Sequence, residues 1–288
     1  SFGQAGQPYM EDAAHLNYPA GIAVEDGALW VAEERGRRAL KLSAPGVQVN
    51  QIGRAGQRYA TGESFETIAD VDTGPDGSIW LVDRSVAHVV QFDANGSVLR
   101  KLGRSYSSGP GNDRFNWPTG VAVDAAGNVY VSDTSNQRIQ IFDNTGAYRA
   151  TLGVTGVCAQ DNAHFCWPYR LDFGPGNLLY IADHGNQSVQ IYSVASPYAP
   201  VYVATIGETG QGGASNTQFD GPAGVAADGR YIYVADENNH RVQLFNQATL
   251  AYVATLGTGW GNGMTNLRHP LDVTVDADGA IYIADNGN

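Results

Sequence analysis

One element recurs six times along this sequence of 288 residues and restricts what the chain can fold into. Each copy has a short apolar strand, a turn that contains Gly, a second apolar strand and then an acidic residue, as in Gly120–Val123 and Val129–Asp133. The closing acids stand at positions 33, 83, 133, 183, 236 and 285, so successive copies are 50, 50, 50, 53 and 49 residues apart. A period this constant indicates a repeat architecture.

A third and a fourth strand follow the acid in the first five copies. In the third copy we expect them over Ile139–Phe142 and up to Leu152–Gly153, joined by the tight turn Asp143-Asn-Thr-Gly146. Alternating apolar positions, β-branched residues and Asx-Gly turns are typical of β-hairpins. No stretch shows a convincing helical period. The sequence therefore predicts an all-β protein with four antiparallel strands in each unit.

A four-stranded unit with two apolar faces cannot bury both faces by itself. Radial stacking against its neighbours covers them, and units of about fifty residues favour a closed ring over a linear solenoid. We therefore predict one domain over residues 1–288, a six-bladed β-propeller with four antiparallel strands per blade. The last blade is expected to be shared between the termini and incomplete, because Ser1-Phe2-Gly3 looks like the end of a fourth strand. A missing chain segment, or strand exchange with another chain, would complete it.

The residues of the repeat resemble a known family. Pro118–Phe142 reads Pro-x-Gly-Val-Ala-Val-Asp at its start and Asn-x-Arg-Ile-Gln-Ile-Phe at its end, and Asn239–Gln243 repeats the second part in varied form. Both segments resemble the NHL repeat, and the resemblance extends over the whole chain. It implies the propeller fold but says little about function, because one fold supports many functions.

The charge of the chain excludes some partners. The net charge is −12, and Lys41 and Lys101 are the only lysines. A chain this acidic repels phosphate backbones, so we predict no nucleic-acid binding. No apolar run approaches the length of a membrane helix, so we predict no membrane insertion.

Two cysteines, Cys158 and Cys166, lie eight positions apart in a polar loop. In an oxidising compartment they would form a small disulfide loop. The alternatives are two unpaired thiols or half of a metal site, although no further ligands stand at metal spacing. We predict the disulfide and, with it, an extracellular, periplasmic or cell-surface location.

Long loops rich in aromatic residues link one repeat to the next and lie on one face of the predicted ring. Binding residues concentrate on such loops of a rigid scaffold. We therefore predict a non-catalytic secreted binding or scaffold module for a protein, peptide or carbohydrate. The candidate contact residues are Tyr59, Tyr106, Trp117, Phe165, Trp167 and Trp260. Their alternative role is packing beneath the loops.

The alternative function is a metal-dependent propeller lyase or hydrolase. His88, His184 and His240 each follow a closing acid, in turns that face the channel, so they could hold a metal there. Their unequal offsets from the acid argue against this. No cofactor is predicted, and the alternative function would use zinc or calcium. Asp-Gly segments such as Asp276–Gly279 lack the ligand spacing of a calcium loop and are expected to be hairpin turns.

One segment also resembles an enzyme subfamily. Leu102–Ser105 followed by Gly111–Phe115 is similar to the corresponding segment of peptidyl-hydroxyglycine amidating lyases, which are propellers with three zinc-bound histidines. His88 lies near the position of the first ligand. However, Tyr169 and Leu271 stand where the other two are expected. The resemblance therefore lacks the full zinc-ligand set, and the sequence favours a binder over an enzyme.

Overall fold

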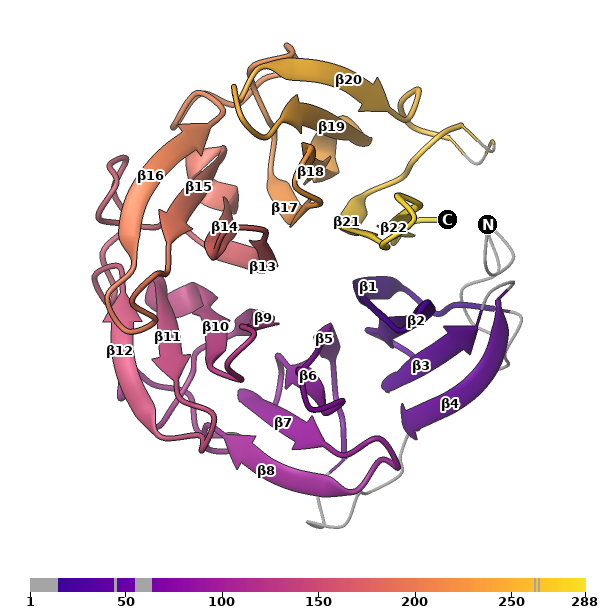
Figure 1. Cartoon of the computed structure of the whole chain (residues 1–288), viewed down its shortest axis with the longest axis vertical. Helices are drawn as coiled ribbons and strands as arrows, with labels where there is room; N and C mark the ends of the chain where they lie inside the picture. The colour runs from indigo at the N-terminus through magenta and orange to yellow at the C-terminus, as the bar shows by residue number, and fades with distance from the viewer. Residues whose placement is uncertain (1–14, 44–45, 55–63, 262, 264) are drawn as a thin grey trace.

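The computed structural model describes residues 15–43, 46–54, 64–261, 263 and 265–288. Within this part the strands form six antiparallel sheets, which Figure 1 shows arranged as a ring around a common axis. The first sheet holds β1 (Pro19–Glu25), β2 (Ala28–Glu33), β3 (Arg38–Ser43) and β4 (Val47–Gly53). The second holds β5 (Ile68–Thr73), β6 (Ile79–Asp83), β7 (His88–Phe92) and β8 (Val98–Leu102). The third holds β9 (Pro118–Val123), β10 (Val129–Asp133), β11 (Arg138–Phe142) and β12 (Tyr148–Leu152).

The remaining sheets continue the ring. The fourth holds β13 (Pro168–Gly174), β14 (Leu178–Asp183), β15 (Ser188–Ser193) and β16 (Val201–Ile206). The fifth holds β17 (Pro222–Ala227), β18 (Tyr231–Asp236), β19 (Arg241–Asn246) and β20 (Tyr252–Leu256), and the sixth holds β21 (Pro270–Val275) and β22 (Ile281–Asp285). Three short 3₁₀ turns follow the second strands of sheets three to five: η1 (Thr134–Asn136), η2 (His184–Asn186) and η3 (Glu237–Asn239).

The prediction of six four-stranded blades is wrong. The described residues form five four-stranded sheets and one sheet of two strands, β21 and β22. In the third sheet the third strand begins at Arg138, five residues after Asp133, whereas only three residues follow Asp285 in the sequence. Within the described residues, the sixth sheet ends with β22. The predicted strand end at Ser1–Gly3 lies outside the described residues.

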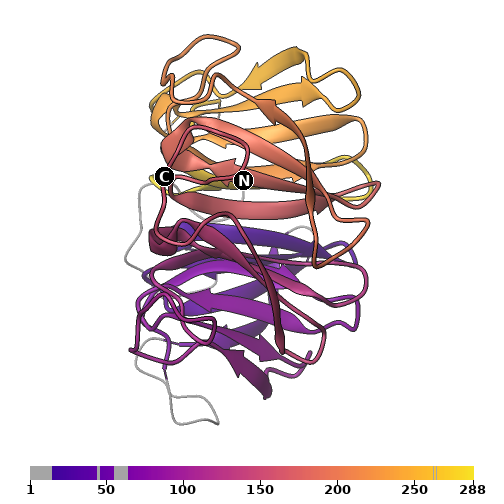
Figure 2. The same ribbon diagram turned by 90° about the vertical axis from the view of Figure 1, so that its left-hand side faces the viewer.

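Each sheet runs from the axis outward in chain order, with its first strand innermost (Figure 1). The side view in Figure 2 shows that the strands cross the thickness of the disc, so the loops gather on its two faces. The hairpin face carries the tight turns between first and second strands and between third and fourth strands. The long-loop face carries the turns after the second strands and the links between sheets.

The core lies between neighbouring sheets rather than at the centre of the disc. Five apolar clusters each join one sheet to the next, and a sixth joins the last sheet to the first through residues such as Ile22, Val31 and Ala284. Ile22 N also donates a hydrogen bond of 2.9 Å to Asp272 Oδ2. The ring is therefore closed by β1 and β21, although the sixth sheet has two strands.

The acid that closes each second strand has a structural role in the described blades. Asp133 is fully buried, accepts a hydrogen bond from Asn116 N at 2.6 Å, and pairs with Arg138 Nε at 2.7 Å. Asp236 makes the same contacts with Asp220 N and Arg241 Nε, each at 2.7 Å. The acids therefore fasten the loop that enters each sheet to its second strand, because a buried carboxylate needs such donors.

Candidate functional site

The wall of the central channel alternates between glycine and charged residues. The residues at the third position of the six first strands are Gly21, Asp70, Gly120, Arg170, Gly224 and Asp272. The glycines leave room for their charged neighbours. A Cβ on Gly224 would lie 2.6 Å from Asp272 Oδ1, and one on Gly120 would lie 2.9 Å from Arg170 Cα. The sequence thus places three charged side chains and three gaps around one level of the channel.

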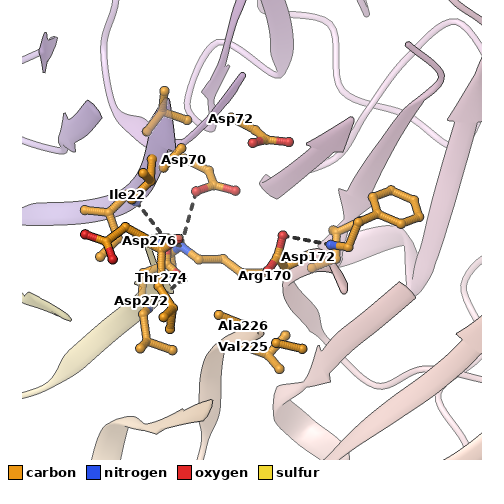
Figure 3. Close-up of a pocket in the computed structure, with 18 of the residues that line it drawn as sticks. Ile22, Asp70, Asp72, Arg170, Asp172, Val225, Ala226, Asp272, Thr274 and Asp276 are labelled. Carbon is orange, nitrogen blue, oxygen red and sulfur yellow. Dashed lines mark hydrogen bonds and ion pairs between the residues drawn. The ribbon is translucent and has the colours of Figure 1, made fainter. Parts of the chain in front are cut away.

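Arg170 joins the two carboxylates at this level, as Figure 3 shows. Its Nε lies 3.5 Å from Asp70 Oδ1 and 3.7 Å from Asp272 Oδ2. Its Nη1 donates to Leu271 O at 3.0 Å and its Nη2 donates to Ala69 O at 2.7 Å. All three side chains are buried. We call this group the charged layer, and it divides the channel into two cavities.

A second polar level lies on the hairpin side of the charged layer. Asp72, Asp172 and Thr274 stand there, and the equivalent positions of the other first strands hold Ala23, Ala122 and Ala226. Asp72 Oδ2 accepts a hydrogen bond from Val123 N at 2.7 Å, and Asp172 Oδ1 accepts one from Phe173 N at 2.7 Å. The carboxylates of Asp72 and Asp172 make no ion pair within the described part of the chain.

Burial raises the pKa of the channel carboxyl groups. The pKa of Asp172 rises to about 7, and the pKa of Asp72 is also well above its usual value because of burial and the nearby Asp172. In the charged layer, burial raises the pKa of Asp70 to about 6 and that of Asp272 to about 8, although Arg170 opposes both shifts. Asp70, Asp172 and Asp272 therefore titrate between about 6 and 8, because ionisation places negative charge in a desolvated site.

The cavity on the hairpin side has a volume of about 570 Å³. Its lining includes Asp72, Asp172 and Thr274, Arg170 of the charged layer, and Asp26, Asp276 and Asp278 from the turns between first and second strands. The carboxyl groups in this cavity already accept hydrogen bonds from backbone N–H groups. They therefore also have a structural role, which is to join the first strands of the ring.

The cavity on the long-loop side has a volume of about 220 Å³, and we call it the bowl. Its polar lining comes from the charged layer, from the first strands and from the residues that follow the closing acids. The lining residues with polar side chains are Glu34, Arg84, Thr119, Tyr169, Arg170, Glu237, His269 and Asn286. These residues are distant in sequence, and the repeat brings them together at one end of the axis.

Charged and aromatic side chains in the bowl pair with one another. Arg84 forms an ion pair with Glu34. The carboxylate of Glu237 lies 3.6 Å from His184 Nε2 on one side and 3.6 Å from His269 Nδ1 on the other. His184 also stacks on Tyr169, with ring centroids 4.1 Å apart.

Aromatic side chains directly precede several of the first strands on the long-loop face, in an unfavourable backbone conformation. The residue before the proline of a first strand has positive φ at Tyr18 (58°), Trp117 (56°), Trp167 (55°), Gly221 (67°) and His269 (54°). Glycine adopts this conformation without strain, whereas other residues do so with a penalty. Gly221 shows that the repeat accepts glycine here. We call Tyr18, Trp117, Trp167 and His269 the aromatic rim.

The predicted contact residues fall into three groups. Tyr106, Trp117, Trp167 and Trp260 are 67, 45, 48 and 58% exposed, on the long-loop side of the ring. Phe165 is fully buried and packs against Tyr192, so it is not available to a ligand. Tyr59 lies outside the described residues. Trp117 and Trp260 each lie beside a guanidinium group, those of Arg84 at 5.0 Å and Arg268 at 4.5 Å.

The three histidines predicted as alternative metal ligands have different surroundings. His88 is buried, and its Nδ1 lies 3.0 Å from Ser105 Oγ. His184 contacts two residues of the bowl lining, Tyr169 and Glu237, and His240 contacts His269 and Trp260 at ring distances of 4.6 and 5.0 Å. Among the described residues, no group of three or more His, Cys, Asp or Glu side chains is placed to hold a metal ion.

The predicted disulfide is present. Cys158 and Cys166 are bonded in the loop that precedes β13. Cys166 N donates to the closing acid Asp183 at 2.7 Å, and Trp167 N donates to Gln137 Oε1 at 2.6 Å. The disulfide therefore fixes the segment that carries Trp167 of the aromatic rim.

Sequence reasoning did not find the charged layer or the polar bowl. The available signal was the alternation of Gly and charged residues at the third position of the first strands. Arg170 is also an unusual residue in an apolar strand. These two signals indicate a charged layer only when the six first strands are placed side by side around one axis.

Comparisons with known proteins agree with this architecture. The NHL repeat family model matches residues 115–142 and 219–245, so the chain carries NHL repeats, as the sequence pattern predicted. None of the curated proteins matches the chain significantly. Nothing in these comparisons shows a relation to the amidating lyases. In the part of the chain that the structure describes, no helix has the length and apolar character needed to cross a membrane.

Several solved structures share the fold. An auxiliary nutrient binding protein from Bacteroides ovatus is 14% identical, with a TM-score of 0.69 over 99% of this chain and 73% of that one. A virginiamycin B lyase from Staphylococcus aureus is 13% identical, with a TM-score of 0.58 over 93% of this chain and 77% of that one. A chain of a nidogen/laminin complex is 18% identical, with a TM-score of 0.61 over 84% of this chain and 82% of that one. At these identities the likeness concerns the fold alone.

Proposed function

We propose that the protein is a non-catalytic binding module that takes its ligand on the long-loop face, in the bowl and against the aromatic rim. The observation that carries this proposal is the residue type at the positive-φ positions. Trp117, Trp167 and His269 hold large rings where Gly221 shows that glycine suffices. Residues kept in such conformations concentrate at functional sites.

The exposure of the rim supports the same proposal. Trp117 and Trp167 leave about half of their surface open to solvent, although burial of such rings would be favourable. Exposed tryptophans beside a concave polar site are typical of binding surfaces. Folding alone gives no reason to place them at the entrance to the bowl.

We propose an extracytoplasmic location, outside the cell, in the periplasm or on the cell surface. The Cys158–Cys166 disulfide supports it, because such bonds persist in oxidising compartments. An auxiliary nutrient binding protein and a chain of a nidogen/laminin complex share the fold, which is compatible with it.

A lyase or hydrolase is the second candidate, and one contact favours it. Glu237 lies between the imidazoles of His184 and His269, which is an arrangement that can hold or move a proton. Elemental analysis of the purified protein separates the two functions. Zinc or calcium at one ion per chain, lost in His184→Ala but not in His164→Ala, would favour the enzyme.

The test of the binding function uses glycine at the rim. We expect Trp117→Gly/Trp167→Gly to fold with a free energy of unfolding within about 1 kcal/mol of the original protein, because glycine relieves the positive-φ strain. Both proteins are then compared on an array of oligosaccharides and against displayed random peptides. We expect the variant to lose about tenfold or more in affinity for the compounds that the original protein binds.

The matched control is Val201→Thr/Val203→Thr. These exposed residues lie on the outer strand β16, away from the bowl. The control should bind as the original protein does. Equal binding by the glycine variant would show that the ligand does not use the aromatic rim and would overturn the proposal.

A further inference from the structure

We infer that the ligand of the bowl is a neutral saccharide, with one sugar ring seated in the bowl and its neighbours lying against the aromatic rim. This inference rests on the proposed binding function and adds the chemical class of the ligand.

The charges that line the bowl balance one another. Two are acidic, Glu34 and Glu237, and two are basic, Arg84 and Arg170. Arg84 is paired with Glu34, and Arg170 is paired with the carboxylates of the charged layer. An anionic ligand would have to displace a carboxylate from its guanidinium group, and a cationic ligand would have to approach two guanidinium groups. A ligand without net charge avoids both penalties.

The polar groups of the bowl can still bond to hydroxyl groups. Glu237 lies 3.6 Å from each imidazole nitrogen, which is beyond hydrogen-bond distance, so its oxygens can accept from a ligand. Asn286, Tyr169 and His269 add donors and acceptors around the same space. A sugar hydroxyl both donates and accepts, so it suits a lining that mixes the two kinds of group.

The size and the rings of the site fit one sugar unit and its neighbours. The bowl is smaller than the roughly 300 Å³ at which pockets for drug-sized ligands begin, so it admits a single ring. Trp117 and Trp167 are about half exposed and precede Thr119 and Tyr169 of the bowl lining by two positions, so the C–H face of a neighbouring pyranose ring can pack against them. Arg84 lies against the ring of Trp117 and holds it at the entrance.

The experiment is calorimetric titration with three sets of hexasaccharides of matched length: neutral glucans and mannans, oligogalacturonate, and chitosan oligomers. We expect a neutral set to bind, with a dissociation constant that changes less than about twofold between roughly 0.05 and 0.5 M NaCl. Glu237→Gln and Trp117→Gly should each weaken this binding about tenfold. Glu208→Gln is the control, because Glu208 is an acid of the long-loop face outside the bowl lining.

The outcomes separate the two proposals. Binding of only a charged set with strong salt dependence, or of no saccharide at all, would overturn the saccharide inference. If peptides then bind the original protein and not the Trp117→Gly/Trp167→Gly variant, the proposed binding function stands and only the saccharide inference fails. If neutral saccharides bind the original protein and all variants with equal affinity, the result would contradict both the saccharide inference and the proposed binding function.

Discussion

Buried carboxyl groups at single positions control how this protein responds to pH. Asp172 has a folded-state pKa of about 7, compared with 3.8 for the free side chain. Because this pKa is raised on folding, Asp172 favours the folded state fully at acidic pH, and this contribution is lost as the pH rises through about 7. Asp72, Asp70 and Asp272 act in the same direction.

We predict that Asp172→Asn stabilises the protein at pH 8 by roughly 2–4 kcal/mol and has little effect at pH 4.5, because the amide stays neutral where the carboxyl group must ionise. Urea unfolding at the two pH values measures the difference. Asp76→Asn is the control, and its change in stability should have the opposite sign. The reason is that the Ser78 hydroxyl lowers the pKa of this exposed carboxylate. A stabilisation that is equal at both pH values would contradict the assigned titration.

The first strands and the loops before them are the elements that build the site. The sequence predicted these strands and their hairpins, because each depends on local periodicity and turn chemistry. It did not predict that Phe165 is buried while Trp167 is exposed. That difference depends on how the loop enters the sheet, with Phe165 packed between strands and Trp167 turned outward at positive φ.

The charged layer escaped prediction for a similar reason. Arg170 is 100 residues from Asp70 and 102 residues from Asp272 in sequence, and no local pattern joins the three. Their contact depends on the closure of the ring. The prediction of six four-stranded blades failed at the sixth sheet, which has two strands, β21 and β22, in the described residues.

We predict that Cys158→Ser/Cys166→Ser lowers the free energy of unfolding by about 2–3 kcal/mol, because the disulfide restricts a short loop in the unfolded chain. Thermal unfolding with and without dithiothreitol measures it. The reductant should lower the melting temperature of the original protein to that of the variant and leave the variant unchanged. A reductant effect of equal size on both proteins would contradict a role for this bond.

At the scale of the whole molecule, the ring has two different ends. The charged layer separates the larger acidic cavity on the hairpin face from the bowl on the long-loop face. The aromatic rim precedes the first strands on the long-loop face, the side of the ring on which the bowl lies. We therefore assign ligand binding to the smaller cavity, because balanced charges line it and exposed rings lie on the same face. The acidic cavity joins the first strands.

Hydrogen exchange of the protein with the strongest-binding array compound tests this assignment most directly. We predict slower exchange in segments 84–86, 117–119, 167–170 and 237–240, which surround the bowl, and no change in hairpins 24–28 and 275–280. Protection of those two hairpins without protection of the bowl would place the ligand in the acidic cavity and contradict the account.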